Sequence, residues 1–163
     1  MSFLKDKKDG EIAENIVEKI LKETFKNATI EKAVGRNPLW DFCVTNKYDE
    51  KITYEVKFDK MSADTGNFAF ELGNNKGPSG IRTSEADFIV YVLPNKDNQK
   101  DKYMLYFFDR AKLLEYIYSD KTIRIVNGGD NRRFKLALLP VQRIIKDISS
   151  LGTTHGVDYE QKK

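Results

Sequence analysis

The sequence of 163 residues is poor in the side chains on which many metal sites and enzymes depend. It contains one cysteine, Cys43, and one histidine, His155. A single cysteine excludes an internal disulfide, and no cluster of cysteine and histidine is available for a zinc site. We therefore do not expect catalysis through a histidine base or a cysteine–histidine pair.

Long apolar runs are also missing. No segment approaches the roughly 20 apolar residues that a helix needs to cross a bilayer. The N-terminal stretch MSFLKDKKDGE has no apolar core of the kind that signal peptides carry. These absences predict a soluble protein of the cytoplasm with no membrane partner.

The composition fits one globular domain with a mildly basic surface. Hydrophobic residues make up 40% of the chain and charged residues 33%, and the formal net charge is +3. This balance permits a nucleic-acid partner without requiring one. We assign residues 1–151 to a single domain and expect the polar residues 152–163 to form a mobile C-terminal tail.

The spacing of apolar residues predicts an α/β domain with a mixed sheet. The first helix is expected from Asp9, as its N-cap, to about Phe25. Strands are predicted at 39–45, 51–58, 67–72, 87–94, 102–109, 122–126 and 133–140, and further helices at 110–120 and 141–151. The strand at 87–94 is almost continuously apolar, which predicts a central position with both faces buried.

The strand KITYEVKF raises the question of a functional face. Its even-numbered residues are apolar, whereas Glu55 and Lys57 lie on the opposite face. The polar stretch TNKYDEK predicts an antiparallel hairpin with the preceding strand, in which Trp40 shares the apolar face and Asp41 does not. If the turn centres on Tyr48, Asp41 lies opposite Glu55, with Cβ atoms roughly 5 Å apart. A shift of one residue in register would separate them.

Two carboxylates and an ammonium group on one face predict a site for a divalent cation. Like charges that face each other across a hairpin are destabilising, and Mg²⁺ prefers carboxylate and other hard oxygen ligands. The pattern acid-x-Lys occurs four times in the sequence, so by itself it also fits a solvated strand face. Glu55 and Lys57 form the one copy on a strand whose other face is apolar.

The segments WDF (40–42) and EVK (55–57) resemble the motif of the PD-(D/E)XK nuclease superfamily. Pro38 departs from that motif, because it lies three positions before Asp41. The resemblance covers roughly residues 9–94. It implies a restriction-endonuclease-like core, α-β-β-β-α-β, in which helices flank a mixed central β-sheet. It further implies DNA phosphodiester hydrolysis that depends on Mg²⁺ or, in its place, Mn²⁺.

The resemblance also assigns roles to residues. It implies that Asp41, Glu55 and the backbone carbonyl of Val56 ligate the metal, and that Lys57 assists the attacking water. Many members of the superfamily add a glutamate from the first helix. Glu14 flanks the apolar stripe of that helix and is preferred here to Glu11.

The segment 65–94 resembles phage-type nucleases, including Holliday junction resolvase-like proteins. That resemblance implies a branched DNA substrate, a homodimer that makes two symmetric cuts, and a bacterial or phage-infected cell. Glu71 is expected on the third strand of the core. The candidates for DNA phosphate contacts are Lys76, Arg82, Thr83, Ser84, Arg132 and Arg133. For the loop residues among them, a role in capping a turn fits equally well.

Two alternatives remain open. One is a restriction-type or DNA-repair nuclease on the same core. The other is a nucleic-acid-binding module that keeps the fold without catalytic activity.

Overall fold

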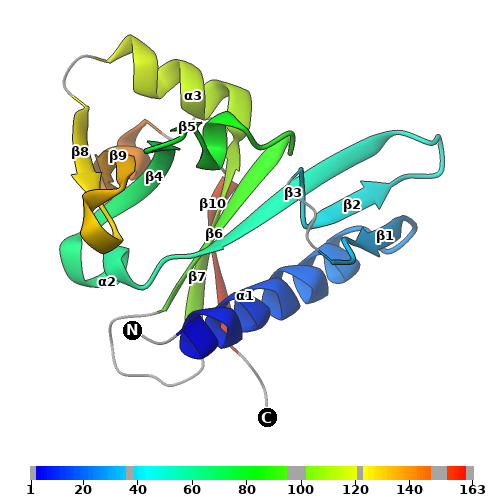
Figure 1. Cartoon of the computed structure of the whole chain (residues 1–163). Helices are drawn as coiled ribbons and strands as arrows, with labels where there is room; N and C mark the ends of the chain where they lie inside the picture. The colour runs from blue at the N-terminus through cyan, green and yellow to red at the C-terminus, as the bar shows by residue number, and fades with distance from the viewer. Residues whose placement is uncertain (1–2, 36–38, 95–101, 121–122, 148–153, 161–163) are drawn as a thin grey trace.

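Two β-sheets organise the chain, one mixed and one antiparallel (Figure 1). The computed structural model describes residues 3–35, 39–94, 102–120, 123–147 and 154–160. The first sheet contains, in spatial order, β1 (Thr29–Lys32), β2 (Phe42–Thr45), β3 (Lys51–Phe58), β6 (Phe88–Pro94), β7 (Lys102–Asp109) and β10 (Thr154–Glu160). The second sheet contains β5 (Gly77–Pro78), β4 (Asn67–Asn74), β9 (Phe134–Pro140) and β8 (Arg124–Gly128).

Helices and short turns connect the sheets. They are α1 (Phe3–Thr24), α2 (Met61–Thr65), α3 (Arg110–Ser119), α4 (Val141–Lys146) and the 3₁₀ turns η1 (Gly80–Arg82) and η2 (Asp130–Arg132). Strands β3 and β6 are parallel, whereas β2 is antiparallel to both of its neighbours. The predicted α/β class with a mixed sheet is therefore confirmed. The second sheet was not predicted.

Strand β6 lies in the middle of the first sheet and is buried on both faces. Ile89, Tyr91 and Leu93 belong to a core shared with the second sheet, α3 and α4. Val90 and Val92 belong to the other core, which α1 covers. The prediction of a central strand buried on two sides is confirmed, and the two cores explain why its apolar run is nearly continuous.

Helix α1 lies beneath β1–β3 in Figure 1, and its apolar residues pack in one core with those of the first sheet. It begins at Phe3, so the predicted start with Asp9 as N-cap is wrong. The preceding residues are mostly Leu, Lys and Asp, and nothing in them stops a helix. Asp9 instead pairs with Lys60 and thereby ties α1 to the start of α2.

The β2–β3 hairpin has the predicted register. Phe42 lies opposite Tyr54 and Thr45 opposite Lys51. Strand β2 is shorter than expected at its start, since it begins at Phe42. The unpredicted strand β1 pairs with its other edge, with Lys32 opposite Phe42.

The segment NFAFEL forms β4, but in the second sheet. Its expected place as a third strand of the main sheet is therefore wrong. The connection from β3 to the parallel strand β6 runs through α2, β4, β5 and η1. Phe68, Phe70 and Leu72 of β4 face the core beside β6, and this burial holds the second sheet against the first.

The C-terminal segment differs from the expected mobile tail. Residues 154–160 form β10, which pairs antiparallel with β7 at the edge of the first sheet. Without β10, β7 would be an edge strand with a row of unpaired backbone groups. Pairing with β10 satisfies them. The other residues of the predicted tail lie outside the described ranges. Within those ranges, no helix is long and apolar enough to cross a membrane.

Candidate active site

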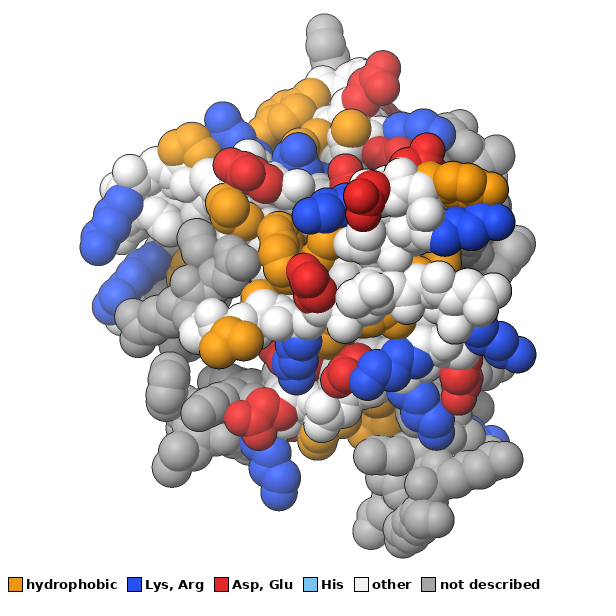
Figure 2. All heavy atoms as spheres, turned by 90° about the vertical axis from the view of Figure 1, so that its right-hand side faces the viewer, with side chains coloured by type: hydrophobic (Ala, Val, Ile, Leu, Met, Phe, Trp, Pro, Cys, Tyr) orange, Lys and Arg blue, Asp and Glu red, His pale blue; other side chains and the backbone are white. Residues whose placement is uncertain are grey.

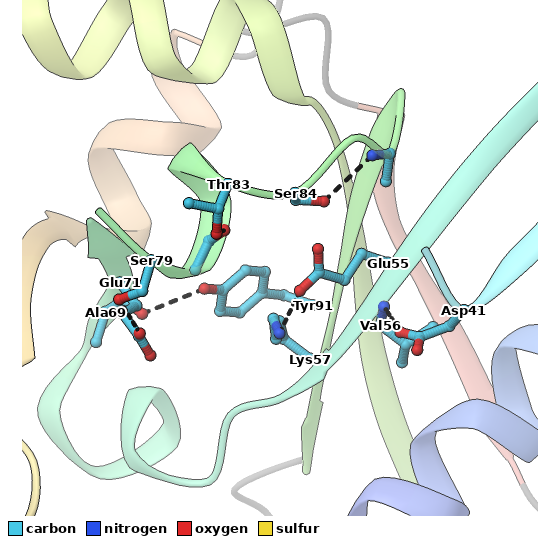
Figure 3. Close-up of polar contacts among 12 residues, drawn as sticks. Asp41, Glu55, Val56, Lys57, Ala69, Glu71, Ser79, Thr83, Ser84 and Tyr91 are labelled. Atoms are coloured by element: carbon cyan, nitrogen blue, oxygen red, sulfur yellow. Dashed lines mark hydrogen bonds and ion pairs between the residues drawn. The ribbon is translucent and has the colours of Figure 1, made fainter. Parts of the chain in front are cut away.

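A cavity of about 360 Å³ lies where β3 of the first sheet faces β4 and η1. It is lined by Glu14, Trp40, Asp41, Glu55, Val56, Lys57, Glu71, Gly80 and Thr83. The four predicted catalytic residues and the third predicted metal ligand are therefore all on one cavity. Figure 3 shows Glu55 and Lys57 between Asp41 on one side and Glu71 on the other.

Asp41 lies at the point where β2 leaves the sheet. Its backbone N–H donates to the carbonyl of Tyr54 at 2.8 Å, and its Oδ2 accepts from the N–H of Val56 at 2.7 Å. Beyond this point β2 no longer pairs with β3. The Asp41 carboxylate therefore accepts the hydrogen bond that a backbone carbonyl of β2 would otherwise accept. Asp41 was predicted to pair with Glu55 across the hairpin, but the ladder ends at Phe42, and Asp41 reaches β3 through its side chain instead.

The Asp41 carboxyl is in an environment that disfavours its charge. Burial raises its pKa above the usual range, and the nearby carboxylates of Glu14 and Glu55 add to the increase. The N–H of Val56 and the ammonium group of Lys57 oppose it. A positive ion in the cavity would relieve the same repulsion.

Glu55 and Lys57 point from β3 toward the second sheet. They pair in the parallel ladder with Ile89 and Tyr91, whose side chains face that way. Glu55 Oε1 forms an ion pair with Lys57, and the two side chains are 13% and 41% exposed. Glu55 Oε2 is buried and accepts no hydrogen bond from the described residues. An orphaned carboxylate oxygen is costly, so this position fits a hard cation such as Mg²⁺.

Glu14 reaches the cavity from α1, whereas Glu11 is exposed and does not line it. Glu14 Oε2 lies 3.1 Å from Nζ of Lys32 on β1. Glu14 is also near enough to Asp41 to raise the pKa of that carboxyl. The geometry therefore favours Glu14 over Glu11, as predicted.

Glu71 also lines the cavity. From the sequence it was expected on the third strand of the core, but not in the site. Its Oε1 accepts from Ser79 Oγ at 2.5 Å. Gly80 has φ +60°, and a Cβ there would lie 2.5 Å from the carbonyl oxygen of Glu71. Only glycine allows η1 to approach β4 so closely. The feature of the sequence that could have indicated this role is the glycine-rich segment that follows Glu71 on its short predicted strand.

Tyr91 lies on β6, and its side chain extends from the first sheet to the second. Its hydroxyl donates to the carbonyl of Ala69 at 3.2 Å. Burial raises the pKa of this hydroxyl well above its usual value, and Asp59, Glu55 and Glu71 add to the increase. Tyr91 therefore stays a neutral donor that joins β6 to β4.

The predicted phosphate-binding residues of the η1 loop separate into two groups. Thr83 lines the cavity, and Arg82 is exposed beside it. Ser84 is only 4% exposed, and its Oγ accepts from the N–H of Ala86 at 3.2 Å. Ser84 therefore caps a turn, and its predicted contact with DNA phosphate is not supported by this placement. Lys76, Arg132 and Arg133 lie at one end of the second sheet, away from the cavity lining.

The carboxylates of the cavity do not converge on one point. Among the described residues, no group of three or more His, Cys, Asp or Glu side chains is arranged to hold a metal ion. Each carboxylate has its own partner: Val56 N–H for Asp41, Lys57 for Glu55, Lys32 for Glu14 and Ser79 for Glu71. The buried Oε2 of Glu55 has no such partner among the described residues, so a cation could bind there while Lys57 remains paired with Oε1.

Comparisons of the chain with protein-family models, with curated proteins and with solved structures gave no match. Function therefore has to be inferred from the cavity itself, which combines acids from α1, the β2–β3 hairpin and β4 around one lysine.

Proposed function

We propose that the chain is a Mg²⁺-dependent DNA endonuclease that hydrolyses phosphodiester bonds at this cavity. One observation carries the proposal. Asp41, Glu55 and Lys57 line one cavity, and an oxygen of Glu55 is buried there without a hydrogen-bond donor. Carboxylates can bind a divalent cation, and an ammonium group beside them can bind a phosphate.

In this proposal Asp41 and Glu55, with the carbonyl of Val56, hold the cation. Bound Mg²⁺ would lower the pKa of a coordinated water and neutralise charge on the phosphate. Lys57 is partly exposed beside Glu55, and its ammonium group would act on the attacking water or on a phosphate oxygen. Glu14, which lies near Asp41 and pairs with Lys32, would orient water in the same cavity.

The order of elements supports the same proposal. Helix α1 is followed by the antiparallel strands β1, β2 and β3, then by the short helix α2, and β6 returns parallel to β3. With β4, β5 and η1 set aside, these elements follow the order α-β-β-β-α-β, which is compatible with the core that the resemblance implies. The second sheet is then an addition, since β4 and β5 come between α2 and β6.

Branched DNA is the substrate that we favour within this proposal, as in the Holliday junction resolvase-like nucleases that segment 65–94 resembles. A homodimer would provide two such cavities for paired cuts. The test is incubation with Mg²⁺ and a panel of four-way junction, flap, linear duplex and single-stranded DNA. We expect paired nicks in the junction. Cleavage at one fixed duplex sequence would instead indicate a restriction-type enzyme.

Two substitutions test the site residues. We expect Glu55→Gln and Lys57→Ala to slow cleavage by at least about 100-fold, because Glu55 would hold the cation and Lys57 would act on the attacking water or a phosphate oxygen. Lys51→Ala is the matched control, since Lys51 is exposed on the same strand outside the cavity. Normal cleavage by either cavity variant would show that the site is wrong. Binding of DNA by the wild type without cleavage in Mg²⁺ or Mn²⁺ would indicate a binding module.

A further inference from the structure

Two turns at one end of the second sheet lie side by side and carry basic residues. Asn74 pairs with Phe134 and Gly73 pairs with Lys135, so the β4–β5 turn adjoins the turn between β8 and β9. The basic hairpin ends, as we call them, comprise the exposed residues Lys76, Arg132, Arg133 and Lys135.

These turns account for the excess positive charge of the chain. Residues 73–78 and 127–135 together contain four Lys or Arg and one Asp, a net charge of +3. The whole chain also has a net charge of +3, so the remaining residues sum to zero. Figure 2 shows another face, on the side of the β2–β3 hairpin, where Lys and Arg are mixed with Asp and Glu. The basic hairpin ends are therefore a local concentration of positive charge.

The backbone of the second turn has a conformation that costs energy. Asn131 and Arg132 are consecutive non-glycine residues with φ of 56° and 54°, in the left-handed region. Each costs on the order of 1 kcal/mol. Gly129 precedes them with φ 70°, and a Cβ on it would overlap the ring of Phe134. A strained turn that exposes two arginines is the kind of local conformation found at binding sites.

The basic hairpin ends lie a short distance from the cavity along β4. Glu71 lines the cavity, and β4 ends at Asn74, three residues further on. At about 3.3 Å per residue, this separation is roughly 10 Å. One DNA duplex is long enough to contact both regions.

We propose that the basic hairpin ends bind backbone phosphates of the DNA whose scissile phosphate lies in the cavity. This inference rests on the proposed function. It makes these residues positioning residues, because they contact DNA away from the reacting atoms. The one large apolar residue within 73–78 and 127–135 is Phe134, and it is half-buried, with its ring against Gly129, rather than free to enter a bilayer. Charge and composition therefore favour nucleic acid over an anionic lipid surface.

The test compares two double variants that each remove two positive charges. In the first, Arg132→Gln is combined with Arg133→Gln. In the control, Lys112→Gln is combined with Arg124→Gln, two exposed residues outside the basic hairpin ends. Equilibrium binding of duplex DNA is measured by filter retention over a range of salt concentrations. We expect the slope of log K against log salt to become shallower by about two in the first variant and to change little in the control.

Two further measurements identify what the contact does. We expect the first variant to raise KM for the DNA by a larger factor than it lowers kcat, since these residues contact DNA away from the reacting atoms. Shortening the duplex by the outer base pairs on one side should abolish the difference in affinity between wild type and variant.

Each outcome has a distinct meaning. Equal slopes for the two variants would overturn the inference, even if the wild type cleaves DNA. Retention of vesicles that contain anionic phospholipid, without retention of DNA, would assign the basic hairpin ends to a lipid surface and also overturn it. If the wild type binds DNA but never cleaves it, and the first variant still has the shallower slope, the inference is supported. The proposed nuclease activity is then wrong.

Discussion

At the scale of single residues, Asp41 serves both the fold and the candidate site. Its carboxylate satisfies the N–H of Val56 where β2 ends. Its charge, however, is opposed by burial and by Glu14 and Glu55. An amide would make the same hydrogen bond without the charge. A carboxylate in this place is therefore better explained by the chemistry of the cavity than by stability.

We predict that Asp41→Asn stabilises the folded chain at neutral pH in the presence of a chelator. The folded-state pKa of Asp41 is raised, so proton binding favours the fold at low pH and this benefit is lost as pH rises through that pKa. Removing the charge should raise the melting temperature at pH 7 by roughly 2–4 °C, the effect of about 1 kcal/mol at this chain length. The gain should vanish below about pH 3.9, the usual pKa of aspartate.

Thermal unfolding of both proteins across this pH range measures the difference. Asp41→Ala is the control: it leaves the N–H of Val56 unsatisfied and should destabilise at every pH by about 1–3 kcal/mol. A lower melting temperature for Asp41→Asn than for the wild type at pH 7 would contradict the prediction.

The sequence predicts part of this site because strands have a side-chain period of two. Glu55 and Lys57 had to share a face once the other face of β3 was buried, and the register of the hairpin brought Asp41 near them. Trp40 was expected on the apolar face with Phe42. Strand β2 begins only at Phe42, so alternation does not extend to Trp40, which lines the cavity instead.

At the scale of elements, the segment from η1 to β6 is held from two sides. Gly80 allows it to press against Glu71 of β4. From the other side, Arg110 of α3 donates through Nε to the carbonyl of Ala86 at 2.9 Å and through Nη1 to that of Ile81 at 3.3 Å. The wall of the cavity that carries Thr83 therefore depends on a glycine and on one guanidinium group.

We expect Gly80→Ala to destabilise the chain by roughly 1–3 kcal/mol, because the new Cβ would meet β4 and φ is positive. Urea denaturation measures the change. Gly10→Ala is the matched control, since Gly10 lies inside α1 with no atom near its would-be Cβ. That change should stabilise by about 0.5–1 kcal/mol. Equal effects of the two substitutions would show that the close approach at Gly80 is unimportant.

Elements with a strong local pattern were predicted, and those made by their neighbours were not. Strands β3, β6 and β7 follow from their apolar patterns, and α3 begins after Asp109, which caps it by accepting from the N–H of Lys112 at 3.0 Å. Strand β1 has four largely exposed residues and exists because β2 offers an edge. Likewise β4 joins the second sheet because of distant partners. Glu71 was missed as a site residue for the same reason.

At the scale of the whole molecule, the cavity lies where the two sheets meet, so a ligand there contacts both. The cores on the two faces of the first sheet otherwise share only that sheet. A cation bound between Asp41 and Glu55 would therefore stabilise the assembly of α1, the hairpin and the second sheet together.

We predict that Mg²⁺ raises the melting temperature of the wild type. At about 100 times its dissociation constant, a ligand adds about 2.7 kcal/mol of stability, which corresponds to roughly 5–10 °C for this chain length. Glu55→Gln should lose most of the increase, and a chelator should reverse it. Sodium chloride of equal ionic strength is the control for screening. An equal increase in Glu55→Gln would place the cation elsewhere.

Trp40 is the only tryptophan in the sequence, and it lines the cavity beside Asp41. Its intrinsic fluorescence therefore reports from the candidate site alone, without labelling and without a tryptophan background from the rest of the fold. A nucleobase or a cation that enters the cavity changes the polarity around the indole and shifts or quenches its emission. The chain thus carries its own optical probe at the one place where occupancy matters most.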